Sequence, residues 1–194
     1  MVKINKKNSE IHVKELEKDD LINSFFDTLS NLTETGKDVY NKEFSQKIFD
    51  KIRKSSNIKI FVAIKDTDIV GSITAILEQK FIHNGGKTCH IEDVVTRKGF
   101  ENLGIGSTLV KKVIELAIQE KCYKVILNCS QYNFKFYEKL GFYKHDIGMR
   151  YNIDIWQIKD TINFILCGPL TSIVIFEMIS LYFCYALNIS KKGP

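Results

Sequence analysis

The 194-residue sequence is poor in proline, tryptophan and arginine, with only two prolines and one tryptophan. Its three arginines, Arg53, Arg97 and Arg150, lie far apart, so lysine supplies most of the positive charge, and the formal net charge is +5. Nucleic-acid-binding surfaces usually gather arginine and aromatic side chains in one block. The sequence has no such block, which argues against nucleic acid as a partner and favours a solubilising surface or attraction of a small anionic molecule.

The sequence also lacks a Cys-x-x-Cys pair and an even number of cysteines. Its five cysteines are Cys89, Cys122, Cys129, Cys167 and Cys184. Zinc sites and disulfide frameworks normally need such spacing or pairing, so we expect free thiols in a reducing compartment and no metal. Residues 1–20 contain no apolar run of a secretory signal, and we expect a cytoplasmic protein.

A long hydrophobic run occurs only near the carboxyl end, where Glu177 is the sole charged residue between 162 and 189. Gly168 and Pro169 interrupt this run and leave about 20 residues, 170–189, enough for a membrane-spanning helix, although a glutamate inside it is costly. Three interpretations stand side by side: a membrane anchor, a helix packed on the domain or dimer, and an artefactual extension of the reading frame. We place the domain at 1–153 and a hydrophobic extension at 154–194.

The hydrophobic patterning predicts alternating strands and helices in the first 153 residues, and 44% hydrophobic residues suffice for a core. The expected strands are 11–17, 58–64, 69–82, 89–96, 123–130 and 142–153. The expected helices are one capped by Asp19 or Asp20, then 39–54, 104–121 and 132–141. This order predicts an α/β (α+β) fold, with a mixed, mostly antiparallel sheet flanked by helices.

Two glycines in "ENLGIGSTL" (101–109) precede the predicted helix 104–121. A dinucleotide fingerprint would need a third glycine where Leu109 stands, and it would follow the strand more closely. A glycine loop at a helix N-terminus can still bind a phosphate through backbone N–H groups. From these residues alone, a flexible turn between strand and helix explains them equally well.

Several short motifs occur in the order found in one enzyme family. They are "LTETG" (32–36), "EQKFIH" (78–83), "HIEDVV" (90–95), "CYKVIL" (122–127) and "NFKFYEKLGF" (133–142). Over residues 10–152 the sequence resembles the GNAT acetyltransferase superfamily and, within it, the glucosamine-6-phosphate N-acetyltransferase family. The resemblance implies a splayed sheet and acetyl transfer from acetyl-CoA to glucosamine 6-phosphate, on the route to UDP-N-acetylglucosamine. It also implies a homodimer in which both subunits contribute to each sugar site.

The resemblance places acetyl-CoA between the strands 89–96 and 123–130, with its pyrophosphate on the backbone of the glycine loop. The implied cofactor contacts are Val94, Val95, Glu101, Asn102, Leu103, Gly104, Ile105, Gly106, Asn133 and Tyr137. Tyr137 resembles the family's tyrosine near the sulfur, where a phenol can donate a proton to the leaving thiolate. Without the resemblance, Tyr137 would be read as a core residue of a helix.

Glu92 and Asp93 are the implied catalytic carboxylates beside the amine and the acetyl group. Because they are neighbours on a strand, alternation predicts that they point to opposite faces. Glu92 would orient the amine or relay its proton through water; the alternative is a pair of solvated carboxylates. The implied substrate contacts are Thr33, Lys80, His83, Glu92, Asp93, Lys124, Asn128 and Arg150.

Three positions depart from the family pattern. Glu101 stands where the family has glutamine or arginine, and a carboxylate repels a pyrophosphate unless it points away. Asn128 replaces a common acidic residue, and Arg150 follows Met149 directly rather than about three residues later. Two rivals remain: an acetyltransferase for a polyamine or a protein lysine and, kept open by Glu101 and Asn128, a weakly active acyl-CoA-binding module tethered to a membrane.

Overall fold

The structure, a computed structural model, describes residues 10–22, 24–36 and 40–151. The chain divides into two units, residues 1–146 and residues 147–194. All the strands and helices described below belong to the first unit.

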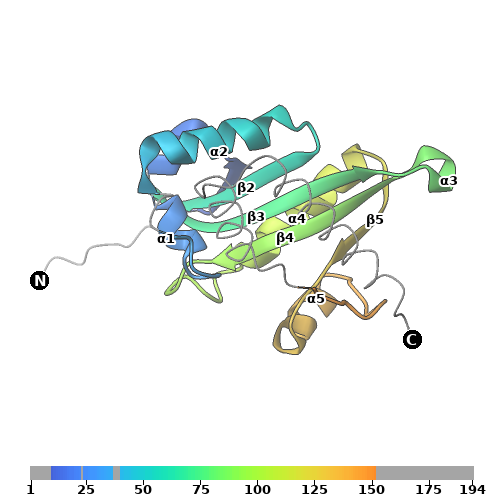
Figure 1. Cartoon of the computed structure of the whole chain (residues 1–194). Helices are drawn as coiled ribbons and strands as arrows, with labels where there is room; N and C mark the ends of the chain where they lie inside the picture. Colours follow the sequence, from blue (N-terminus) through green and yellow to red (C-terminus); the bar gives the residue numbers. More distant parts are fainter. Residues whose placement is uncertain (1–9, 23, 37–39, 152–194) are drawn as a thin grey trace, which may run out of the picture. The chain divides into compact units, whose positions relative to one another are not determined.

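A five-stranded sheet forms the centre of this unit, with its strands in chain order (Figure 1). The strands are β1 (His12–Glu15), β2 (Ile58–Lys65), β3 (Asp68–Gln79), β4 (Lys87–Thr96) and β5 (Cys122–Leu127). Neighbours from β1 to β4 are antiparallel, and β5 runs parallel to β4. The predicted mixed, mostly antiparallel sheet is confirmed.

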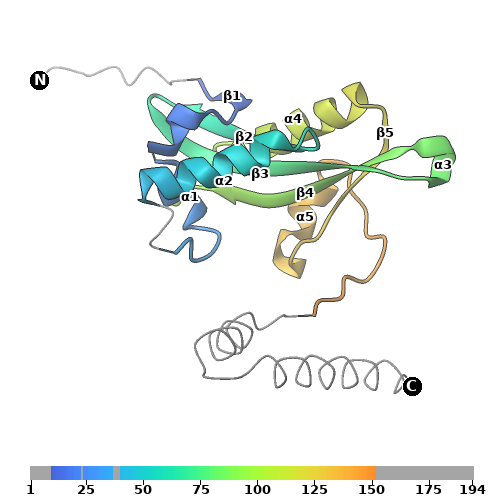
Figure 2. The ribbon, with the colours of Figure 1, turned by 45° about the horizontal axis from the view of Figure 1, so that its top comes forward.

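Helices cover both faces of this sheet. They are the 3-10 turn η1 (Lys18–Ile22), α1 (Phe25–Leu29), α2 (Lys42–Lys54), α3 (Ile82–Gly85), α4 (Ile105–Gln119), the 3-10 turn η3 (Gln131–Asn133) and α5 (Phe134–Glu138). Figures 1 and 2 show α1 and α2 on one side of the sheet and α4 on the other. The long β3–β4 hairpin extends past these helices and carries α3 at its tip (Figure 1).

Two apolar clusters identify the two faces of the sheet. On one face, Cys89 and Ile91 of β4 belong to the cluster that contains Leu109 and Val113 of α4. On the other face, Val62 of β2 belongs to the cluster of η1, α1 and α2. Because side chains alternate along a strand, the residues between those of the first cluster face away from α4. We call the side of β4 and β5 that faces away from α4 the open face.

The first two predicted helices differ in detail from the structure. Asp20 does not cap a helix; it is buried, accepts a hydrogen bond from the Glu17 N–H at 2.8 Å and pairs with Lys14 at 3.0 Å. Helix α2 begins later than predicted because Asn41 caps it, accepting a hydrogen bond from the Phe44 N–H at 3.1 Å. Phe44 itself is 44% exposed, so it contributes little to the core that its spacing predicted.

The predicted final strand, 142–153, is wrong for the residues that the structure describes. Residues 142–151 contain no strand. The aromatic and apolar side chains that a strand would have buried on one face are exposed, Tyr143 at 79% and Met149 at 96%. Alternation produces a strand only where a neighbouring edge supplies hydrogen bonds and one face meets a core. Neither condition is met here within the first unit.

The predicted membrane-spanning helix at 170–189 lies outside the described residues. Within the described part of the chain, no helix is both long enough and apolar enough to cross a membrane.

Candidate active site

The parallel strands β4 and β5 separate at their carboxyl ends. Their pairing runs from Lys87 opposite Cys122 to Ile91 opposite Leu127 and stops there, while β4 continues to Thr96 beside β3 alone. Beyond Leu127 the chain leaves the sheet and forms η3 and α5 (Figure 1). Among the described residues, 92–96 therefore have no strand partner on the β5 side. A strand edge of this kind can bind the amide groups of an extended ligand through main-chain hydrogen bonds.

A β-bulge lies on this edge. Ser72 pairs with Val95 and Thr74 with Glu92, so two residues of β4, Asp93 and Val94, lie opposite one residue of β3. Asp93 has a φ of 52°, in the left-handed region. The expected opposition of Glu92 and Asp93 stays a prediction: Glu92 keeps the face of its partner Thr74, and the bulge interrupts strict alternation only from Asp93 on. A strained non-glycine residue of this kind costs on the order of 1–3 kcal/mol and is typical of functional sites.

The loop after β4 leads into the N-terminus of α4. Asn102 and Gly104 have φ values of 62° and 79°, and Gly104 caps α4 without any side-chain hydrogen bond. The first-turn N–H groups of this 15-residue helix are thus not satisfied by a side-chain cap. Left-handed residues beside a helix N-terminus form a concavity of N–H groups that suits a phosphate. The geometry fits the cofactor role predicted for 101–106.

Glu101, the first departure from the family pattern, is turned toward its own loop. Its Oε2 accepts a hydrogen bond from the Gly99 N–H at 2.7 Å. The carboxylate therefore satisfies a local backbone donor.

Two glycines allow the first turn of α4 to pack closely on its neighbours. A Cβ on Gly71 of β3 would lie 2.5 Å from Ile105 Cγ2, and one on Gly106 would lie 3.2 Å from Phe136 of α5. Real Cβ atoms almost never approach another atom as closely as 2.5 Å, so only glycine at position 71 permits this packing. The N-terminus of α4 is thereby held between β3 and α5, beside the opening of β4 and β5.

Tyr137 lies on α5, beyond the end of β5. It is 7% exposed, and its ring contacts those of Phe136 and Phe142, with centroids 4.9 and 5.9 Å apart. Burial, and to a smaller extent the thiol of Cys129, raise the pKa of Tyr137. The phenol therefore stays neutral and able to donate a proton. Cys129 is exposed, just past β5.

The open face carries the polar groups of β4 and β5. Glu92 is exposed and pairs with Thr74 of β3. Lys124 of β5 pairs with Thr88 of β4, which precedes Glu92 by four residues and so lies on the same face of the strand. Asn128 directly follows the last residue of β5. Three of the predicted substrate contacts are thus brought to one side of the opened strands.

The remaining predicted substrate contacts are not all brought together. Lys80 forms an ion pair with Glu78. The ring of His83 lies against that of Tyr123, with the ring centroids 4.3 Å apart. Both contacts are at the α3 end of the hairpin. Thr33 follows α1, in a loop that Asn31 ties to the other end of β4 by accepting a hydrogen bond from the Lys98 N–H.

The register shows how far apart these two groups lie. Gly71 pairs with Thr96 near the Thr33 loop, and Gln79 pairs with Lys87 near α3. At about 3.4 Å per residue these two positions of β3 are roughly 27 Å apart. One sugar phosphate cannot reach both groups within a single chain. Arg150 belongs to the other unit and is not placed relative to the site.

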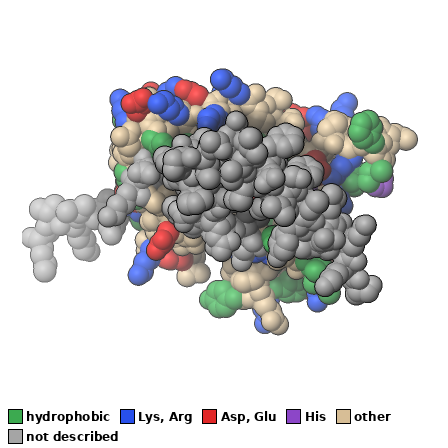
Figure 3. All heavy atoms as spheres, in the orientation of Figure 1, with side chains coloured by type: hydrophobic (Ala, Val, Ile, Leu, Met, Phe, Trp, Pro, Cys, Tyr) green, Lys and Arg blue, Asp and Glu red, His purple; other side chains and the backbone are tan. Residues whose placement is uncertain are grey.

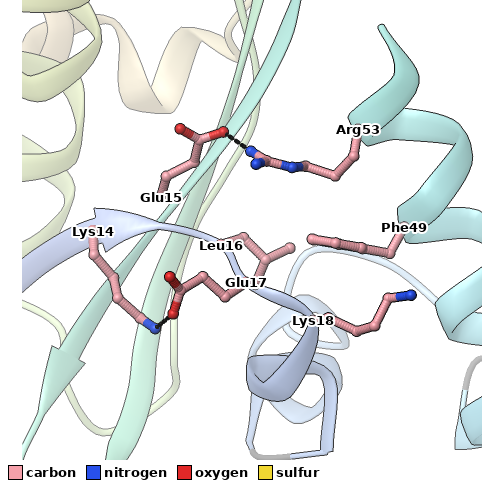
Figure 4. Close-up of a pocket in the computed structure, with 7 residues that line it drawn as sticks. All are labelled: Lys14, Glu15, Leu16, Glu17, Lys18, Phe49 and Arg53. Carbon is pink, nitrogen blue, oxygen red and sulfur yellow. Dashed lines mark hydrogen bonds and ion pairs between the residues drawn. The ribbon is translucent and has the colours of Figure 1, made fainter. Parts of the chain in front are cut away.

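A cavity of about 320 Å³ lies elsewhere, between β1 and α2 (Figure 4). Its charges are paired: Arg53 with Glu15, Lys14 with Glu17 at 2.8 Å, and Lys18 with Asp50 at 2.7 Å. We assign it no role in the chemistry. Across the part of the chain that the structure describes, no cluster of three His, Cys, Asp or Glu residues could hold a metal ion.

Comparison with known proteins identifies the family of the chain. The sequence profile of the acetyltransferase (GNAT) family matches residues 21–142. The chain is 32% identical over 142 residues to glucosamine 6-phosphate N-acetyltransferase 1 of Dictyostelium discoideum, covering 72% of this chain and 88% of that one. It is 36% identical over 141 residues to the glucosamine 6-phosphate N-acetyltransferase of Arabidopsis thaliana, covering 71% and 93%.

Solved structures agree with these relatives. The crystal structure of glucosamine-6-phosphate N-acetyltransferase from Arabidopsis thaliana matches with a TM-score of 0.71 and 33% identity, covering 75% of this chain and 99% of that one. An acetyltransferase from Trypanosoma brucei matches with a TM-score of 0.69 and 33% identity, covering 74% and 100%. The resemblance predicted from the short motifs is confirmed. The chain belongs to the acetyltransferase (GNAT) family and, within it, to the glucosamine 6-phosphate N-acetyltransferases.

Proposed function

We propose that the protein transfers the acetyl group of acetyl-CoA to the amino group of D-glucosamine 6-phosphate, giving N-acetylglucosamine 6-phosphate and CoA. The observation that carries this proposal is the opening of β4 and β5 after Ile91, beside a helix N-terminus without a side-chain cap. The relatives that share this chain's sequence carry the name of the same activity. The product is a precursor of the kind needed for UDP-N-acetylglucosamine.

In this proposal acetyl-CoA lies along the free edge of β4. The N–H groups of 101–106 bind the pyrophosphate, and the helix dipole of α4 adds a favourable field. Val94 and Val95 offer main-chain groups to the pantetheine arm and the thioester, and Asn133, at the start of α5, contacts the coenzyme. An amide at the bulge, aimed at the acetyl oxygen, would stabilise the charge of the tetrahedral intermediate.

The amine attacks the thioester directly, in a complex of both substrates. Glu92, exposed on the open face, accepts the proton that the ammonium group must lose before attack. Asp93 supports the bulge through its left-handed backbone. Tyr137, neutral because its pKa is raised by burial, donates a proton to the departing thiolate.

The division of the predicted sugar contacts into two groups supports a homodimer. The α3 tip of one copy would bring Lys80 and His83 to the sugar site of the other. Phe81 and Ile82 on that tip are 105% and 61% exposed, and Figure 3 shows hydrophobic side chains gathered at this end of the visible face. Exposed apolar residues of this kind are typical of a contact between subunits.

The function is tested with the full-length protein, acetyl-CoA and four amines: glucosamine 6-phosphate, glucosamine, spermidine and a lysine peptide. Release of CoA thiol is followed for each. We expect the highest kcat/KM with the phosphorylated sugar. Glu92→Gln should lower kcat and leave the KM for acetyl-CoA unchanged, while Glu17→Gln, remote on the surface, serves as the matched control. Equal rates with all four amines would contradict the proposal.

A further inference from the structure

His90 lies on the open face beside Glu92, and the mechanism above leaves it without a role. Along β3, Ile76 pairs with His90 and Thr74 with Glu92, so the two β4 side chains share one face just ahead of the bulge. Alternate residues of a strand have Cα atoms about 7 Å apart. One water molecule can bridge an imidazole and a carboxylate at that spacing.

Glu78 of β3 holds the imidazole in place. His90 Nε2 lies 2.9 Å from Glu78 Oε2, and the same carboxylate pairs with Lys80. The hydrogen bonds from Lys80 and, secondarily, His90 lower the pKa of Glu78, so the carboxylate accepts and Nε2–H donates. This contact selects the tautomer in which Nδ1 keeps its lone pair. The side chain of His90 is 32% exposed, so water reaches it.

The reaction must dispose of one proton in each turnover. R–NH3⁺ and acetyl-CoA give R–NH–CO–CH3, CoA–SH and one H⁺; of the two protons that leave nitrogen, one ends on the thiol. A carboxylate holds the other only weakly near neutral pH, whereas imidazole takes up and releases a proton in that range.

We propose that the Glu78–His90 pair is a proton relay behind Glu92, an inference that rests on the proposed function. The N–H bond of the ammonium breaks toward Glu92, and the proton then passes through one water to His90 Nδ1 and from there to solvent. No oxidation or reduction is involved. His90 is a positioning residue in this scheme, because it acts through Glu92 and does not touch the substrate.

Among the described residues, charged groups on or next to three strands lie near His90. Glu78 faces it from β3, Lys80 follows the end of that strand, Glu92 shares β4, and Lys124 lies at an alternate position of β5. Glu78 keeps the ring oriented.

The test uses the full-length protein and begins with wild-type turnover of glucosamine 6-phosphate, which judges the function by itself. His90→Gln keeps an N–H donor for Glu78 and removes the imidazole ring. We expect its kcat to fall by about tenfold or more near neutral pH, with the KM for acetyl-CoA unchanged and the acidic limb of the kcat profile altered. His12→Gln, at the exposed first residue of β1, is the matched control.

His90→Gly, checked for folding by circular dichroism, provides the second measurement. Imidazole added to the assay should restore part of the lost rate to this variant and leave His12→Gly unaffected. A relay explains such rescue, and a purely structural role does not. The proposal is overturned if His90→Gln keeps the wild-type kcat and pH profile, or if folded His90→Gly is not rescued.

Discussion

Replacing Gly71 by alanine should displace the first turn of α4. The added Cβ would lie 2.5 Å from Ile105 Cγ2, 3.0 Å from Leu109 Cδ1 and 3.2 Å from the Val95 carbonyl oxygen. The first of these is roughly 1 Å short of ordinary contact, and both side chains are fully buried, so the helix itself must move. Overpacking of this kind costs about 1–3 kcal/mol. The unfolded chain has less backbone entropy with alanine than with glycine at this position, and this difference offsets about 0.4–1 kcal/mol of that cost.

The expected net loss is therefore about 1–2 kcal/mol in the free energy of unfolding, measured by urea denaturation. Because the turn that moves carries the proposed pyrophosphate site, the KM for acetyl-CoA should rise several-fold, whereas a surface substitution such as Lys47→Ala should change neither quantity. Ile105→Leu removes the clashing Cγ2 and keeps the side-chain volume. Combined with Gly71→Ala, it should recover about 1 kcal/mol relative to the sum of the single changes. Wild-type stability and KM in Gly71→Ala would refute the packing argument.

Three further predictions concern single side chains. Tyr137→Phe should lower kcat by about tenfold or more with little change in the KM for either substrate. Because burial raises the pKa of Tyr137, the wild-type phenol should also stay protonated and active up to pH 10.0, the ordinary pKa of tyrosine. Unchanged turnover would remove it from the mechanism. Glu101→Gln keeps an oxygen for the Gly99 N–H and loses the charge, so the KM for acetyl-CoA should fall a few-fold, most clearly at low salt; a rise would mean that the charge assists binding. Burial raises the pKa of Cys89 to about 11, so at pH 8 iodoacetamide should label exposed Cys129 far faster, and acetyl-CoA should slow Cys129 alone, as read by peptide mass spectrometry. Equal labelling of the two cysteines would contradict the burial of Cys89.

The helix α4 and the strand before it were predictable because their signals are local. Leu109, Val110 and Val113 recur with helical spacing, and the core cluster on α4 contains all three. The strand 142–153 was predicted from a local signal too, and it failed within 142–151 because a strand also needs a partner edge. Alternation indicates that a segment could bury one of its faces as a strand. It does not indicate whether the folded chain offers that segment a strand edge and a core to pack against.

The residues of the candidate site could be proposed from the sequence, whereas its geometry could not. Two acids within an apolar strand hinted at something unusual, and the structure gives that position a bulge at Asp93. No sequence rule assigns a left-handed φ to one aspartate among many. The contact of Glu101 with the Gly99 N–H depends on the path of a loop, and the pairing of His90 with Glu78 depends on the register of two strands. These contacts arise only once the chain is folded.

Binding of acetyl-CoA to the free edge at 92–96 would raise the free energy of unfolding of the protein. A ligand that binds only the folded chain stabilises it by RT ln(1 + [L]/Kd), about 2.7 kcal/mol at 100 times Kd. An extended pantetheine arm occupying that edge would add a strand to the five that the structure describes. The abundance of folded enzyme would then follow the supply of acetyl-CoA in the cell, and starvation for acetyl groups would shorten the lifetime of the protein as well as slow its reaction.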